Sequence, residues 1–121
     1  MYTATVEITF KATHSLLLPD NQKEPLHEHD WKVTATVESR QLDAYGMVID
    51  FHKLQKLLKK TVEPLGRAAS VNELPDFQNG NPSTECIAKY IYDKLAGKLA
   101  GNLTLRKVVL WETPDCRACY R

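Results

Sequence analysis

The sequence predicts an α+β fold: one domain, residues 1–121, whose four-stranded antiparallel sheet is covered on one face by two helices. Two segments near the start alternate apolar and polar residues with the period of a strand. Near the end, one segment is rich in β-forming residues and another could form a short final strand. Two central segments repeat apolar residues at helical spacing. Strands adjacent in sequence with helices segregated between them are typical of antiparallel α+β sheets. A chain of 121 residues suffices for one hydrophobic core and is too short for two.

The composition excludes several classes of protein. A hydrophobic fraction of 43% and a charged fraction of 26% are ordinary for a soluble globular protein. The net charge of +1 argues against a nucleic-acid or membrane partner, and we find no spanning segment, signal peptide or transit peptide. An odd number of cysteines (Cys86, Cys116 and Cys119) favours a reducing, cytoplasmic location. The Cys116–Cys119 spacing could indicate a redox pair or second metal site, but it lacks a second pair of ligands.

The first predicted strand runs from Tyr2 to His14. Its even-numbered positions are apolar, its odd-numbered positions are polar, and His14 continues the apolar series. The second strand extends to about Arg40, and there His27 and His29 share the parity of Trp31 and the following apolar residues. If these strands pair antiparallel, the three histidines meet at one end of the hairpin, on its apolar side.

Three imidazoles without a fourth protein ligand are typical of a catalytic zinc site with an open position. The alternative is that these histidines are ordinary polar residues at strand ends. His52 belongs to a predicted helix and is expected on the surface. The connection between the strands, Ser15 to Leu26, has a turn at Pro19-Asp20-Asn21. Because it joins the histidine-bearing ends, Lys23 and Glu24 are expected near the metal.

The first helix follows a turn at residues 41–46 and an apolar lead-in at residues 47–49. Asp50 is expected as its N-cap, and Pro64 and Gly66 are expected to end it. Its lysines are expected to form a solvated face. Its buried stripe is predicted to consist of Phe51, Leu54, Leu57, Leu58 and Val62.

The second helix follows an irregular stretch, Arg67 to Gly80. Asn81 is expected as its N-cap with Pro82 at its first position, and Gly101-Asn102 is expected to end it. Its buried stripe is predicted to consist of Ile87, Ala88, Ile91, Leu95 and Leu99. The last strands are predicted at Leu103 to Glu112 and Cys116 to Arg121. A four-stranded sheet keeps open edges, so association between subunits is expected.

Five stretches, in this order and spacing, resemble the 6-pyruvoyl-tetrahydropterin synthase / 6-carboxy-tetrahydropterin synthase family. They are Ala12-Thr13-His14-Ser15-Leu16, Leu26-His27-Glu28-His29, Gly46-Met47-Val48-Ile49-Asp50-Phe51, Asn81-Pro82-Ser83-Thr84-Glu85 and Trp111-Glu112-Thr113. The resemblance implies the tunnelling fold, in which small units assemble into barrels, as trimers stacked into hexamers with active sites between subunits.

The same resemblance implies site residues and an activity. His14, His27 and His29 would hold Zn²⁺, and Glu112 would anchor the pterin ring. Thr113, Ser83, Thr84 and Glu85 would line the pterin pocket. The substrate would be 7,8-dihydroneopterin triphosphate, on which zinc acts as a Lewis acid while a protein base removes a proton.

This chain departs from the family pattern at three places. No cysteine base precedes the histidine pair, and Glu24 resembles the family variant in which glutamate replaces it and 6-hydroxymethyl-dihydropterin is formed. Residues 65–69 lack the family's Asp-His pair, and Glu28 stands where glycine is usual. Lys23 and Arg67 are the candidates for neutralising the triphosphate.

Three hypotheses follow from these residues. The first is a zinc-dependent lyase with Glu24 as base, and the second is a 6-carboxy-tetrahydropterin synthase of queuosine biosynthesis. The third is a homologue that binds zinc and pterin without turnover.

Overall fold

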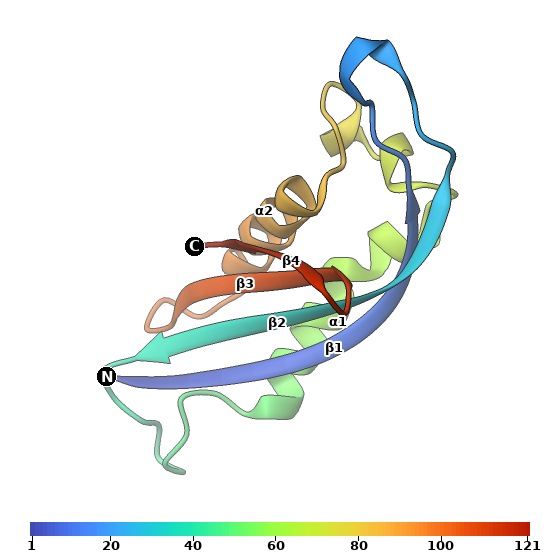
Figure 1. Ribbon diagram of the computed structural model, residues 1–121. Helices are drawn as coiled ribbons and strands as arrows, with labels where there is room; N and C mark the ends of the chain where they lie inside the picture. The colour runs from blue at the N-terminus through green and yellow to red at the C-terminus, as the bar shows by residue number, and fades with distance from the viewer.

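The computed structural model describes residues 1–121 and confirms the α+β class. Four strands form one antiparallel sheet in the order β1-β2-β3-β4, and two helices cover one of its faces (Figure 1). The main elements are β1 (Tyr2–His14), β2 (His27–Ser39), α1 (Phe51–Arg67), α2 (Thr84–Ala96), β3 (Thr104–Thr113) and β4 (Cys116–Tyr120). Three short 3-10 helices are η1 (Pro19–Asn21), η2 (Val71–Glu73) and η3 (Pro75–Phe77). Neither α1 nor α2 has the length and apolar character of a membrane-spanning helix.

The long hairpin of β1 and β2 is confirmed with the predicted alternation. Its register is unbroken from Tyr2 opposite Ser39 to His14 opposite His27. The apolar series of both strands faces the helices, where Trp31, Val33 and Val37 are fully buried. His14 is fully buried as well, because it continues the inward-facing series of β1. The pairing therefore brings the three histidines to one end of the hairpin.

Helix α1 begins as predicted and ends later. The Asp50 carboxylate accepts a 2.8 Å hydrogen bond from the backbone N–H of His52, which confirms the N-cap. Phe51 is exposed rather than buried, because it occupies the first turn beyond the edge of the core. Pro64 lies inside the helix instead of ending it, and the next turn continues because Leu65 is anchored in the core.

Gly66 also does not end α1, and its position reflects close packing of the helix on the sheet. A Cβ atom at this residue would lie 2.9 Å from the backbone oxygen of Lys11 on β1. Only glycine therefore allows α1 to approach β1 this closely without a shift of the backbone.

Both predicted ends of α2 are wrong. Ser83 rather than Asn81 is the N-cap, with its hydroxyl accepting a 3.1 Å hydrogen bond from the backbone N–H of Cys86. The helix ends at Ala96, with Gly97 as the C-cap, rather than at Gly101-Asn102. Turn-type bonds from the N–H groups of Lys98 and Leu99 satisfy carbonyls of the last turn. Leu99 nevertheless packs against the core from outside the helix.

Candidate active site

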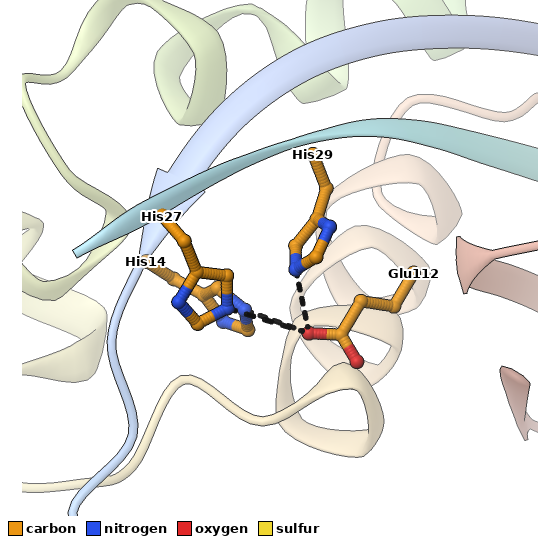
Figure 2. Close-up of side chains that lie close together, drawn as sticks. All are labelled: His14, His27, His29 and Glu112. Atoms are coloured by element: carbon orange, nitrogen blue, oxygen red, sulfur yellow. Dashed lines mark hydrogen bonds and ion pairs between the residues drawn. The ribbon is translucent and has the colours of Figure 1, made fainter. Parts of the chain in front are cut away.

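The three histidines predicted to bind a metal converge in the structure. The rings of His27 and His29 are 4.6 Å apart between centroids, and the His14 ring lies 4.6 Å from His27 and 5.6 Å from His29. One ligand atom from each, together with a carboxylate oxygen of Glu112, lies within 4.8 Å of all the others. Figure 2 shows the histidines on one side of this group and Glu112 opposite them.

Backbone carbonyls fix the orientation of two of the rings. His14 Nδ1 lies 2.8 Å from the carbonyl oxygen of Pro82, and His27 Nδ1 lies 3.0 Å from that of Pro25. A carbonyl oxygen only accepts, so both Nδ1 atoms carry the proton and donate it. The Nε2 atoms of both rings therefore point toward the centre of the group, as in histidine ligands of zinc.

The buried Trp31 side chain packs against two of the histidines. Its indole N–H donates to the Ala12 carbonyl oxygen at 3.0 Å, and its ring contacts His14 and His29 edge to face, with centroids 5.0 and 5.5 Å away. Burial lowers the pKa of His29 from 6.5; the Glu112 carboxylate opposes this effect, and the rings of His27 and His14 add to it. This lowering of the pKa favours the neutral form of His29, which is the form that binds a metal.

Glu112 reaches the histidines from the end of β3. Its side chain continues the inward-facing series of Val108 and Leu110. Trp111 pairs with Arg117 and Thr113 with Cys116, so Glu112 is an extra residue in the β3–β4 register. Such bulges re-aim side chains near functional sites. Glu112 also shares the parity of the buried Val108 and Leu110, which was a signal that sequence reasoning left unused.

The residues present fit a divalent cation. Three imidazole nitrogens, two of them on rings held with Nε2 directed inward, form the ligand set that Zn²⁺ prefers at catalytic sites. The structure brings together the three histidines that the sequence predicted as ligands, His14, His27 and His29. His52 is exposed on α1 and takes no part, as predicted.

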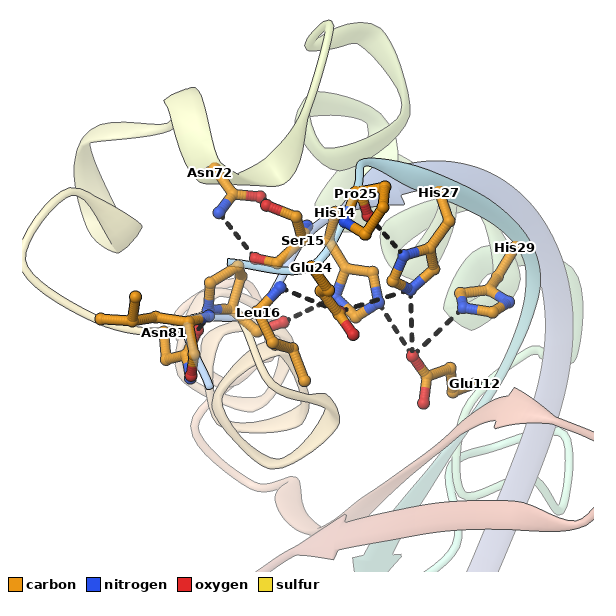
Figure 3. A network of polar contacts seen from close by, with 12 residues as sticks. His14, Ser15, Leu16, Glu24, Pro25, His27, His29, Asn72, Asn81 and Glu112 are labelled. Carbon is orange, nitrogen blue, oxygen red and sulfur yellow. Dashed lines mark hydrogen bonds and ion pairs between the residues drawn. The ribbon is translucent and has the colours of Figure 1, made fainter. Parts of the chain in front are cut away.

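Glu24 is fixed beside the histidines (Figure 3). Its Oε1 accepts a 2.9 Å hydrogen bond from the backbone N–H of Leu16 and lies 3.7 Å from His27 Nε2. Glu24 N–H also donates to the Leu16 carbonyl oxygen at 3.0 Å, so two hydrogen bonds join the two residues. Because Oε1 accepts the hydrogen bond from Leu16, Oε2 is the carboxylate oxygen available to accept a proton.

Two asparagines that sequence reasoning missed hold the same segment from its other side. The Asn72 amide accepts from the Ser15 N–H at 2.9 Å and donates to the Ser15 carbonyl at 2.8 Å. Asn81 makes the same pair with Leu17, at 2.8 and 2.9 Å. The two side chains thus make the hydrogen bonds to the backbone of Ser15 and Leu17 that a neighbouring strand would otherwise make. Sequence periodicity does not predict such contacts, because they join residues that are 57 and 64 positions apart in the chain.

Other predicted site residues lie outside this cluster. Lys23 is exposed and pairs through its backbone with Leu17, and Arg67 is exposed and forms an ion pair with Glu63.

Ser83 caps α2, and Thr84 and Glu85 occupy its first turn, next to the carbonyl that orients His14. Thr113 follows Glu112 at the end of β3. Cys86, Cys116 and Cys119 are free, exposed and absent from the cluster.

Comparison with known proteins identifies relatives across nearly the whole chain. Residues 3–121 match the family model described as 6-pyruvoyl tetrahydropterin synthase. A dihydroneopterin monophosphate aldolase of Pyrococcus furiosus is 32% identical over 104 residues, which cover 86% of this chain and 83% of the relative. A 6-carboxy-5,6,7,8-tetrahydropterin synthase of Aquifex aeolicus is 29% identical over 126 residues, covering 85% of this chain and 78% of the relative.

Solved structures share the fold at lower identity. A Caenorhabditis elegans 6-pyruvoyl tetrahydropterin synthase superposes with a TM-score of 0.82 at 22% identity, covering 99% of this chain and 94% of that chain. A catalytic-residue mutant of a Plasmodium vivax 6-pyruvoyltetrahydropterin synthase, with glutamate changed to alanine, gives a TM-score of 0.72 at 18% identity, covering 99% of this chain and 98% of that one.

Proposed function

The chain belongs to the 6-pyruvoyl tetrahydropterin synthase family, and we propose that it is a zinc-dependent lyase that cleaves the side chain of a phosphorylated 7,8-dihydroneopterin. The products would be 6-hydroxymethyl-dihydropterin and a phosphorylated glycolaldehyde. The observation that carries this proposal is the Glu24 carboxylate beside His27, at a site that contains no cysteine. The aldolase from Pyrococcus furiosus supports this reaction type, and the Plasmodium vivax protein has a glutamate as a catalytic residue.

The cleavage is a retro-aldol reaction. Glu24 Oε2 takes the proton of the hydroxyl on the second side-chain carbon, and the bond between the first and second carbons breaks. Its electron pair passes into the ring imine, and a proton returns to the first carbon, so no oxidant or water is consumed. Zinc held by His14, His27 and His29 would supply Lewis-acid stabilisation of the side-chain oxygens.

Substrate recognition would begin with Glu112, whose carboxylate accepts two parallel hydrogen bonds from the pterin amino group and ring N–H. Thr113, Ser83, Thr84 and Glu85 lie close in sequence to groups that contact the histidines, which supports their assignment to the pterin pocket. Lys23 and Arg67 are exposed, so either would reach the phosphates only at the rim or from a neighbouring subunit.

We expect the chain to act as a homo-oligomer, a trimer or hexamer, with its site near a subunit boundary. Strand β1 pairs only with β2, so the other edge of this 13-residue strand is open to a second copy. Exposed Tyr2, Met47 and Phe51 surround an apolar hollow of about 750 Å³ next to that strand. Sedimentation velocity would measure the assembly, and a monomer at micromolar concentration would contradict it.

Two other functions remain as candidates. The Aquifex aeolicus relative favours a 6-carboxy-tetrahydropterin synthase, as in queuosine biosynthesis. The absence of the Asp-His pair from residues 65–69 favours a protein that binds zinc and pterin without turnover.

One experiment separates the three functions. Zinc-loaded protein is incubated with the triphosphate and with the monophosphate of 7,8-dihydroneopterin, and products are identified by mass spectrometry. Hydroxymethyl-pterin supports the lyase, a carboxy-pterin supports the second candidate, and unchanged substrate supports the third. Glu24→Gln should lower the rate about 10²–10⁴-fold. Glu28→Gln is the matched control, because Glu28 lies between the histidine ligands and is exposed on the opposite face. Equal rates for both variants would exclude Glu24 as the base.

A further inference from the structure

The short segment that follows His14 holds the candidate base between two sets of hydrogen bonds. The Leu16 N–H donates to Glu24 Oε1 on one side of the segment (Figure 3). Ser15 and Leu17 form their hydrogen bonds on the other side, with the amides of Asn72 and Asn81. The position of Glu24 therefore depends on contacts that the carboxylate itself does not make.

Asn81 and Pro82 contact both ends of this segment. The Asn81 amide accepts from the Leu17 N–H at 2.8 Å and donates to the Leu17 carbonyl oxygen at 2.9 Å. The Pro82 carbonyl oxygen lies 2.8 Å from His14 Nδ1. The Asn81 carbonyl oxygen accepts from the N–H of Ser83, the N-cap of α2, at 2.8 Å. The start of α2 thus sets the spacing between the His14 ring and the Leu17 backbone.

Stability alone does not account for the Asn81 amide. Ser83 rather than Asn81 caps α2, and both Asn81 and Leu17 are exposed. Water would therefore satisfy the Leu17 backbone nearly as well as the amide does. What water does not supply is a fixed direction. A side chain that donates and accepts at once holds the peptide groups on both sides of Leu17 in one orientation.

We propose that Asn81 is a positioning residue that acts on the reaction through the backbone of Leu16 and Glu24. This inference rests on the proposed role of Glu24 as the base. The Leu17 N–H and the Leu16 carbonyl belong to one planar peptide group. Asn81 accepts from the N–H of this group, and the carbonyl accepts from the Glu24 N–H at 3.0 Å. One rigid unit therefore connects the Asn81 amide to the backbone of Glu24.

Loss of the amide would release this peptide group and let the Glu24 carboxylate shift. Glu24 Oε1 lies 3.7 Å from His27 Nε2, so a small shift changes the position of the base relative to the reacting side chain. A displacement of about 1 Å can cost about 10²-fold in rate. The histidines would keep their places, because His27 and His29 belong to β2 and Pro82 still holds the His14 ring.

Turnover of the zinc-loaded protein on the monophosphate of 7,8-dihydroneopterin tests the proposal. Asn81→Ala should lower kcat by about 10–10²-fold. The KM and the zinc affinity should stay within about twofold of wild type, because the ligand set and the pterin pocket are unchanged. Asn102→Ala is the matched control, since Asn102 is an exposed asparagine in the turn between α2 and β3, and it should retain the wild-type kcat.

A double-mutant cycle shows whether Asn81 acts through Glu24. In Glu24→Gln the side chain keeps an oxygen for the Leu16 N–H but is no longer a base, so adding Asn81→Ala should lower the rate no further. A loss by the same factor in both backgrounds would overturn the proposal, because Asn81 would then act on the whole site.

Amide hydrogen exchange in the absence of substrate tests the positioning without turnover. In NMR spectra, Asn81→Ala should speed exchange of the Glu24 N–H by about tenfold or more, whereas Asn102→Ala should leave it unchanged. Unchanged exchange at Glu24 in Asn81→Ala would refute this inference alone. A protein that forms no hydroxymethyl-pterin would refute the proposed function, and faster exchange at Glu24 would still support its positioning by Asn81.

Discussion

The backbone N–H of Leu16 donates a 2.9 Å hydrogen bond to Oε1 of Glu24. This contact links the candidate base to the two asparagine amides that clamp Ser15 and Leu17 on the other side of the same segment. Because His14 immediately precedes Ser15, one short stretch of backbone positions both a candidate metal ligand and the candidate base. This stretch therefore sets the distance between the Glu24 carboxylate and His14.

The two clamps should differ in their contribution to stability. Asn72→Ala leaves the N–H and carbonyl of Ser15 without partners in a fully buried position. We expect the free energy of unfolding to fall by about 2–3 kcal/mol. Asn81→Ala frees the same groups of Leu17, which is 55% exposed, so water replaces the amide and the loss should be about 1 kcal/mol or less. Urea denaturation measures both, and a larger loss for Asn81→Ala would contradict this account.

The fold and the convergence of the three histidines were predictable because both depend on local periodicity. Alternation along residues 2–14 and 27–39 fixed the bounds of β1 and β2 to within a residue and placed His14 on the buried face. The predicted helix ends were wrong where tertiary contacts determine the local structure. The sequence suggested Asn81 as the helix N-cap because Pro82 follows it. In the structure the Asn81 amide binds the backbone of Leu17, and Ser83 is the N-cap. Gly66 resembled a helix terminator, yet it serves close packing on Lys11.

Substitution at Gly66 tests that packing. Alanine favours a helix over glycine by about 1 kcal/mol, so an unhindered Gly66→Ala change would stabilise α1. Its Cβ would instead lie 2.9 Å from the Lys11 carbonyl oxygen, and overpacking of this kind costs about 1–3 kcal/mol. We expect net destabilisation by about 1 kcal/mol in thermal unfolding. Gly101→Ala is the matched control, because no atom lies within 4 Å of its added Cβ. A stabilised Gly66→Ala variant would show that α1 is free to move.

Tyr90 should make stability depend on pH in the alkaline range. Burial raises the pKa of its phenol above 10.0, and the Asp76 carboxylate adds to the shift. Above pH 10 the unfolded chain releases this proton while the folded protein retains it, so stability falls as pH rises. Urea denaturation between pH 9 and about 11 should show a steeper loss for wild type than for Tyr90→Phe. Parallel curves would show that Tyr90 titrates alike in the folded and unfolded states.

Zinc should stabilise the protein through the three converging histidines and not through His52. At a free zinc concentration about 100-fold above Kd, binding to the folded state alone contributes about 2.7 kcal/mol, which corresponds to roughly 10 °C in Tm for a chain of this size. His29→Ala removes one partly exposed ligand without opening the core and should abolish most of this shift.

His52→Ala should retain the full zinc-dependent shift, because that ring is exposed on α1 and lies outside the cluster. Differential scanning fluorimetry with and without a chelator measures both variants. The comparison matters because zinc also binds stray surface histidines, which would raise Tm by a small amount in every variant. Equal shifts in His29→Ala and wild type would mean that the ion binds elsewhere, and the orientation of His14 and His27 by Pro82 and Pro25 would then need a different explanation.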